Sequence, residues 1–176
     1  MKATLFPIRT LALIPALALT SPPALAADFP AGPTPAADMN ENSQTVIKAE
    51  TRTSRRASDS TFTGTVHHES MLSATGDAPY AVSSVSFEPG ARSFWHTHPA
   101  GQRLVVTSGS GLTGTADGKV EIINAGDVVD CPAGVKHWHG AAPTTAMSHI
   151  VITPMKNGKN VEWMEAVTDE QYSGSE

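Results

Sequence analysis

The stretch that decides the fold of this 176-residue chain is GARSFWHTHPAGQ, residues 90–102. It places two histidines two residues apart, between a turn glycine and a second Gly-rich turn. Side chains alternate between the two faces of a strand, so His96 and His98 point to the same face, about 6–7 Å apart along the chain. Two imidazoles on one face can converge on one metal ion. The stretch therefore predicts part of a metal site on a strand.

Five of the seven histidines fall into three small groups, and the second group repeats the spacing of the first. His137 and His139 are also two residues apart, and His149 follows in a later apolar run. His67 and His68 are adjacent, and adjacent strand residues point to opposite faces. We therefore expect this last pair to be ordinary polar residues outside the site.

The remainder of the chain has the pattern of an all-β protein. Short alternating or apolar runs recur roughly every 8–12 residues with Gly or Pro between them, which favours a sandwich or barrel. Asp117-Gly118 lies between two such runs and predicts a tight hairpin. The spacing from Thr168 to Gln171 predicts a capping box and a short terminal helix. Strands are expected at residues 62–66, 80–87, 104–107, 112–115, 119–123, 127–131 and 147–153.

The N-terminus has the features of a secretory signal peptide. Lys2 and Arg9 provide the positive charge, a short apolar stretch follows, and Ala24-Leu25-Ala26 gives a small-x-small cleavage signal. The apolar stretch is too short to span a bilayer. We expect cleavage after Ala26 and a secreted or periplasmic protein that does not associate with the membrane once residues 1–26 are removed.

Three regions follow from these patterns. After the signal peptide, residues 27–60 lack periodicity and are predicted to be a flexible leader. Residues 61–176 form one domain, which ends in an acidic tail. The formal net charge is −5, and no basic run follows residue 60, so nucleic acid is not expected as a partner. The only cysteine, Cys131, lies in an apolar run and is expected to be a buried packing residue.

Two motifs resemble those of the cupin superfamily. GARSFWHTHPAGQ with Gly109 seven residues later is similar to the first cupin motif, and Gly126, Pro132, Gly134 and His137 are similar to the second. A hairpin of the right size separates them, and the resemblance covers about residues 61–172. It implies a single-domain jelly-roll β-barrel with a short C-terminal helix, and by analogy a homodimer or homotetramer.

A narrower resemblance is to small bacterial manganese cupins with (R)-selective hydroxynitrile lyase activity. It rests on HTHPAGQ (96–102), HWHGAAPTTAM (137–147) and WMEAVTDEQY (163–172). The resemblance implies one divalent ion, Mn²⁺ before Fe²⁺, Ni²⁺ or Zn²⁺. It also implies that His149 is the catalytic base, with His139 as the reserve candidate. The implied metal ligands are His96, His98, Gln102 and His137.

The chain departs from the general cupin pattern at two positions. Gln102 stands where the first motif has Glu, and Ala141 replaces the Asn that closes the second motif. Three neutral imidazoles and a neutral amide leave a bound ion its full charge of +2. Such an ion is a stronger Lewis acid than one bound by a carboxylate.

The implied reaction is the cleavage or synthesis of a cyanohydrin of the mandelonitrile type, a small-molecule substrate. A neutral histidine near the ion would accept the hydroxyl proton. Phe94, Trp95 and Trp138 are candidates for an apolar wall that binds an aromatic substrate, or for ordinary barrel packing. Two other functions stay open: a metal-dependent cupin dioxygenase, and a non-catalytic exported module that binds metal or a small ligand.

Overall fold

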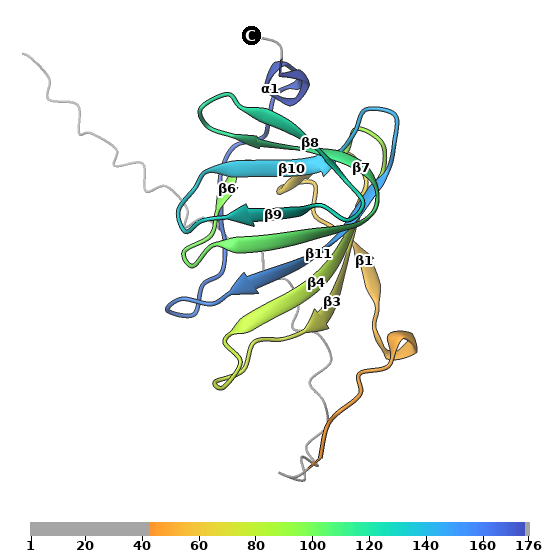
Figure 1. Ribbon diagram of the computed structural model, residues 1–176, viewed down its shortest axis with the longest axis vertical. Coiled ribbons are helices and arrows are strands. Elements are labelled where there is room, and N and C mark those ends of the chain that lie inside the picture. The colour runs from red at the N-terminus through yellow and green to blue at the C-terminus, as the bar shows by residue number, and fades with distance from the viewer. Residues whose placement is uncertain (1–42, 175–176) are drawn as a thin grey trace, which may run out of the picture.

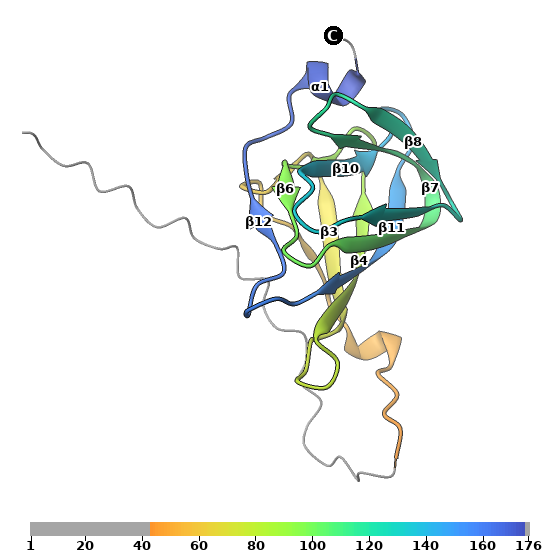
Figure 2. The ribbon, with the colours of Figure 1, turned by 60° about the vertical axis from the view of Figure 1, so that its left-hand side comes forward.

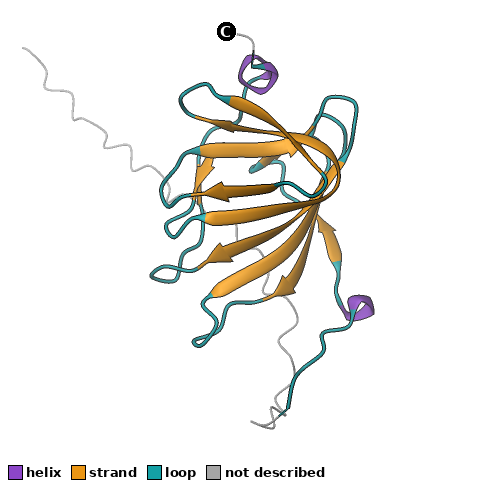
Figure 3. Ribbon diagram, in the orientation of Figure 1, coloured by secondary structure: helices purple, strands orange, loops and turns teal. Residues whose placement is uncertain are grey.

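Strands dominate the part of the chain that the computed structural model describes, residues 43–174 (Figures 1 and 3). A short 3-10 helix, η1 (Ala49–Thr51), precedes them, and α1 (Asp169–Ser173) follows them. The strands are β1 (Ser54–Arg56), β2 (Phe62–Thr63), β3 (Val66–Leu72), β4 (Tyr80–Phe87), β5 (Arg92–Ser93), β6 (His96–Thr97), β7 (Gln102–Thr115), β8 (Val120–Asn124), β9 (Val128–Cys131), β10 (His137–Ala141), β11 (Met147–Pro154) and β12 (Glu162–Trp163).

The long strand β7 joins two curved sheets into a barrel (Figure 1). Its first half pairs with β9 and β11, and β11 continues through β4 and β3 to β1. Its second half pairs with β8 and β10, and β10 continues to β5 and β6. The all-β fold that the strand pattern predicted and the barrel that the cupin resemblance implied are both confirmed.

A glycine makes the change of sheet along β7 possible. Gly109 has φ +74°, and a Cβ atom there would lie 1.8 Å from the carbonyl oxygen of Ala146. Only glycine avoids that clash and adopts this backbone conformation without strain. The strand can therefore pass close to the start of β11 and continue into the second sheet.

Apolar side chains fill one end of the barrel. Val66, Phe87 and Met147 are in register on β3, β4 and β11, so all three point to the same face. They are fully buried in the larger core cluster. The interior beyond this apolar end contains the histidines.

Most predicted elements are confirmed in place. The strand over Tyr80–Phe87 has the expected bounds, and Gly114 pairs with Val120 across the hairpin. The side chain of Thr168 caps α1 in the expected box. The predicted strand over 62–66 is interrupted at Gly64 and divides into β2 and β3, whereas the short run at 104–107 is part of the much longer β7.

Regular structure begins before residue 61. Within the range predicted as a leader, η1 forms and β1 pairs with β3 through Arg55 opposite His68. The predicted signal peptide (1–26) and the first part of the leader (27–42) lie outside the described residues. No helix within residues 43–174 is long and apolar enough to cross a membrane.

The C-terminal residues 160–174, which we call the strap, run along the outside of the barrel beside β6 and end in α1 (Figure 2). The guanidinium group of Arg92, which is buried, donates hydrogen bonds to the carbonyl of Val167 and to the carboxylate of Asp169. The hydroxyl of Tyr172 donates to the carbonyl of Ala141. Ala141, which replaces the asparagine of the general motif, is fully buried, and its side chain packs in the core cluster with Phe87 and Met147.

Candidate functional site

Three of the predicted ligands come together inside the barrel. His137 on β10 is directly opposite His96 on β6, and their ring centroids are 4.3 Å apart. The ring of His98 lies 5.0 Å from that of His96 and 5.4 Å from that of His137. All three side chains are buried. The i, i+2 spacing therefore does place His96 and His98 on the inner face, as predicted.

Backbone carbonyls fix the orientation of these three rings. The Nδ1 atom of His96 donates to the carbonyl of Phe94, that of His98 to Asn160, and that of His137 to Val135. A neutral imidazole has one N–H group, so a proton on Nδ1 leaves the lone pair on Nε2. Each ring therefore presents an atom that can bind a metal ion, as ligating histidines do in known metal sites.

The fourth predicted ligand is oriented in a similar way. The amide nitrogen of Gln102 donates to the hydroxyl of Thr153 at 3.3 Å, so its Oε1 atom is the free acceptor. Within the described residues, Oε1 of Gln102 and the Nε2 atoms of His98 and His137 are buried without a hydrogen-bond partner. Buried polar atoms without a partner are rare and costly. Atoms of this kind, aimed into one space, fit a bound cation.

His139 also belongs to this cluster. The nitrogens of His96, His137 and His139 lie within 4.8 Å of one another. His139 differs from the three rings above in the partner of its Nδ1 atom. That atom is 3.2 Å from Nε2 of His149 rather than bonded to a backbone carbonyl.

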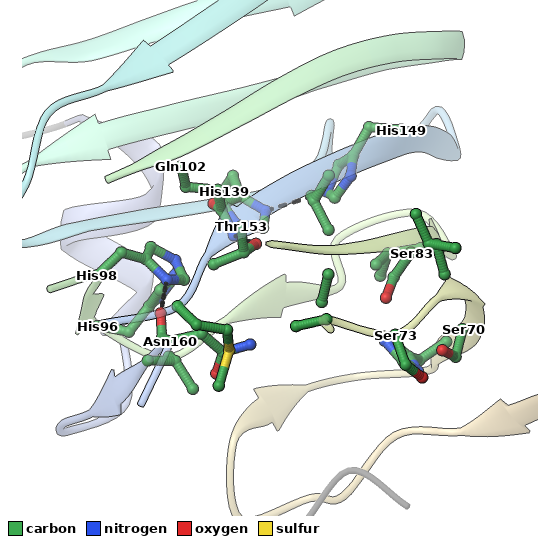
Figure 4. A pocket seen from close by; sticks show the side chains of 18 of the residues that line it. Ser70, Ser73, Ser83, His96, His98, Gln102, His139, His149, Thr153 and Asn160 are labelled. Carbon is green, nitrogen blue, oxygen red and sulfur yellow. Dashed lines mark hydrogen bonds between the residues drawn. The ribbon is translucent and has the colours of Figure 1, made fainter. Parts of the chain in front are cut away.

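His139 and His149 form a buried imidazole pair between β10 and β11 (Figure 4). Phe87 packs against both rings, with centroid distances of 5.8 Å and 5.4 Å. One of the two nitrogens in the shared hydrogen bond carries the proton, and the outer nitrogens, Nε2 of His139 and Nδ1 of His149, have no partner within residues 43–174. The pair can therefore accept a proton at a buried position beside the predicted ligands.

Burial keeps all these histidines neutral. Desolvation lowers the pKa of His149 to about 3, and it lowers the pKa of His98 to about 4 against the opposing effect of the Asn160 carbonyl. The pKa values of His96 and His139 are lowered well below the ordinary value, again chiefly by desolvation and then by neighbouring histidines. Neutral imidazole is the form that binds metal and accepts protons.

A consequence is that the metal-free protein should lose stability in mild acid. The unfolded chain binds protons at His98 and His149 below about pH 6.5, whereas the folded state resists them down to about pH 4 and pH 3. Stability therefore falls as the pH drops below 6.5, by about 2 kcal/mol for each of the two residues by pH 4.5. Urea unfolding at pH 7.0 and pH 4.5 measures this difference. A His149→Phe variant should show a smaller drop, and an equal drop would show that His149 does not contribute.

The cavity beside the cluster has a volume of about 340 Å³. Its polar lining includes the side chains of His96, His98, Gln102, His139 and His149. Figure 4 shows a second group of polar side chains, Ser70, Ser73 and Ser83, in the same cavity. Its larger apolar lining residues are Phe62, Leu72, Val85, Val151, Met155, Val161 and Trp163.

Of the two roles left open for Phe94, Trp95 and Trp138, the structure supports barrel packing for the two tryptophans and an apolar wall for none of the three. Trp95 and Trp138 lie in a separate core cluster with Val167 and Tyr172 under the strap, and Phe94 does not line the cavity. The reason is strand alternation: Trp95 is next to His96, and Trp138 is between His137 and His139, so the tryptophans point away from the histidines.

Three contributions to the site were not predicted from the sequence. The strap supplies the Asn160 carbonyl that orients His98, and its Trp163 is paired with His96 and packs 4.8 Å from that ring. A backbone carbonyl has no signature in residue type, so only the fold could reveal it. His68 also lines the cavity, although it was predicted to be outside the site.

Cys131 is buried, as predicted, and lies behind one of the candidate ligands. Its Sγ atom is 3.2 Å from Nδ1 of His137. Desolvation, assisted by Asp130, raises the pKa of the thiol to about 11, so it stays protonated and unreactive at neutral pH.

Comparison with known proteins places these features in context. Residues 83–153 match the family model for the cupin domain. The chain is 57% identical over 111 residues to an (R)-mandelonitrile lyase from Granulicella tundricola. The aligned region covers 63% of this chain and 85% of the relative. A solved cupin-like protein from Thermotoga maritima is 40% identical, with TM-score 0.63, over 66% of this chain and 89% of that one. A polyketide cyclase from Streptomyces resistomycificus has the same fold at 15% identity, with TM-score 0.58 over 74% of this chain and 92% of that one.

Proposed function

Because this chain belongs to the cupin family, we propose that it is a metal-dependent hydroxynitrile lyase that cleaves a cyanohydrin of the mandelonitrile type. The relative from Granulicella tundricola is named for this reaction and shares more than half of the aligned residues. The products would be an aldehyde and hydrogen cyanide, and the reverse reaction would join them.

The proposal is carried by two sets of buried atoms at one cavity: atoms that can bind a metal ion, and the nitrogens of a histidine pair that can accept a proton. His98 and Gln102, each with an unpartnered atom that can bind a metal ion, line the same cavity as the His139–His149 pair. The ring of His137, whose Nε2 is also unpartnered, lies 4.3 Å from that of His96, which lines this cavity too. We assign His96, His98, Gln102 and His137 as the ligands of one divalent ion. A divalent ion held by neutral ligands would stabilise negative charge on an oxygen atom as a Lewis acid.

The His139–His149 pair is the base of the proposed reaction. Both rings are neutral and buried. The ring that donates the shared hydrogen bond has a bare outer nitrogen, which can accept the hydroxyl proton of the substrate, whereas the other ring carries its proton on its outer nitrogen. The shared hydrogen bond lets the two rings stabilise the resulting charge together. The C–C bond to the nitrile then breaks, its electron pair leaves with cyanide, and the proton held by the pair is returned to form hydrogen cyanide.

The apolar side of the cavity would bind the remaining substituent of the substrate. Phe62 and Trp163 are in edge contact at 5.4 Å, and both line the cavity. An aromatic ring packs well against such a pair. The same residues exclude water from the base, which favours elimination of cyanide over side reactions.

Several further expectations remain part of the proposal. On the resemblance of the ligand pattern, Mn²⁺ is the ion that we propose. The basic, apolar and small-residue segments of residues 1–26 support export to the periplasm or the medium. Association into a homodimer or homotetramer is proposed by analogy with other cupins.

The proposal is tested by product analysis with racemic mandelonitrile. We expect equal amounts of benzaldehyde and cyanide, with consumption of one enantiomer before the other and no uptake of oxygen. Spontaneous decomposition, measured with heat-denatured protein, is the control. Oxygen uptake with catechol or flavonol substrates and no release of cyanide would instead support a dioxygenase.

A further inference from the structure

His68 faces the same interior as His149, from a strand two positions away in the same sheet. His68 on β3 is opposite Val85 on β4, and Val85 is opposite His149 on β11. Directly opposite residues of neighbouring antiparallel strands point to the same face. The three side chains therefore share the inner face, and two strand spacings of about 4.8 Å separate His68 from His149. Both histidines line the cavity.

The next residues along these strands continue a polar surface. Ser70 on β3 is opposite Ser83 on β4, and both hydroxyl side chains line the cavity (Figure 4). Ser83 is buried. The cavity therefore has three distinct parts: the histidine cluster, the apolar side with Phe62 and Trp163, and this polar wall.

A cyanohydrin has three different groups on its reacting carbon. When the hydroxyl group lies at the His139–His149 pair and the aryl group lies on the apolar side, the nitrile remains for the polar wall. A nitrile nitrogen accepts hydrogen bonds, and negative charge develops on the cyanide group as the C–C bond breaks. An N–H donor at this position stabilises that charge.

We propose that His68 binds the nitrile group of the substrate and the cyanide that leaves, a role that rests on the lyase function proposed above. The ring donates one N–H to the nitrile nitrogen and exchanges no proton. The proton taken from the hydroxyl group by the His139–His149 pair is the one that completes hydrogen cyanide.

The surroundings of His68 fit a neutral donor. Burial lowers the pKa of His68, and the opposing effect of the Glu69 carboxylate is smaller. Glu69 is itself paired with the Arg52 guanidinium at 2.5 Å, which offsets its charge. At neutral pH the ring is therefore neutral and carries one N–H group.

The test compares two rod-shaped ligands of similar size that lack the reactive hydroxyl group. Phenylacetonitrile ends in a nitrile, and 3-phenylpropyne ends in an alkyne that cannot accept a comparable hydrogen bond. Calorimetric titration of the metal-loaded wild-type protein should show tighter binding of the nitrile by about 3- to 10-fold, the factor expected for one hydrogen bond. His68→Leu should abolish the preference, and His68→Gln should restore part of it.

His67 provides a matched control because it is adjacent, exposed and on the outer face. His67→Leu should keep the preference for the nitrile and the wild-type KM for cyanide in the synthetic direction, whereas His68→Leu should raise that KM. Metal content and melting temperature of each variant report its folding.

The outcomes separate the two proposals. Wild-type cleavage of mandelonitrile with no effect of His68→Leu on nitrile preference or on KM for cyanide would overturn the role of His68 and leave the lyase function intact. A nitrile preference that depends on His68, without any cleavage by the wild type, would support the nitrile site and overturn the lyase function. Neither cleavage nor preference would overturn both.

Discussion

Replacement of His149 by alanine should lower kcat for mandelonitrile cleavage at least about 100-fold, the lower range for loss of a general base. The bound ion should remain, because none of the four proposed ligands contacts the substituted side chain through a hydrogen bond. What is lost is the hydrogen bond to His139 and one of the two places where the substrate proton can be accepted.

Kinetics of three variants, with metal content measured on the same samples, check this prediction. Since the two rings act as one base, His139→Ala should have a similar effect, and the double variant should be little worse than either single one. Wild-type turnover in His149→Ala would remove this residue from the mechanism. Multiplied losses in the double variant would show instead that the two rings act independently.

Removal of a proposed ligand should lower activity at least as much and should also remove the ion, which His149→Ala retains. His137→Ala deletes an imidazole whose Nδ1 is fixed by the Val135 carbonyl and whose Nε2 points into the cluster. We expect loss of most of the bound ion, loss of lyase activity by more than about 100-fold, and loss of the rise in melting temperature that metal gives the wild type.

Elemental analysis and thermal melting with and without Mn²⁺ measure this effect. Gln102→Glu is the informative comparison, because it should retain the ion but bind it with a carboxylate, which weakens its Lewis acidity and lowers kcat. His67→Ala, at an exposed position, is the neutral control. Full metal content in His137→Ala would show that another residue, with His139 the nearest candidate, completes the site.

Strand periodicity carried most of the fold and part of the site. The i, i+2 histidine pairs placed His96 and His98 on one face, and the structure has both inside the barrel. The same rule, applied to their neighbours, excludes Trp95 and Trp138 from the substrate wall. The choice between a substrate wall and barrel packing could be made from the sequence, because the alternation that directs a histidine inward directs the adjacent tryptophan outward.

Other features depend on contacts between residues distant in sequence. Either residue of the His67–His68 pair had to face inward, but only the register of β3 against β4 shows that it is His68. The Asn160 carbonyl that orients His98 is 62 residues away in sequence, and any residue could supply it. β1 was missed because its polar residues lack an apolar alternation: it is an exposed edge strand held by pairing with β3.

The proposed function requires that one ion, bound by His96, His98, Gln102 and His137, makes this barrel a cyanohydrin lyase. Its most direct test is a titration of the metal-free wild-type protein with Mn²⁺ while benzaldehyde and cyanide release from mandelonitrile is followed. We predict that the rate rises in proportion to bound ion and levels off at one ion per chain. Full activity without metal, or no activity at full occupancy, would contradict the account.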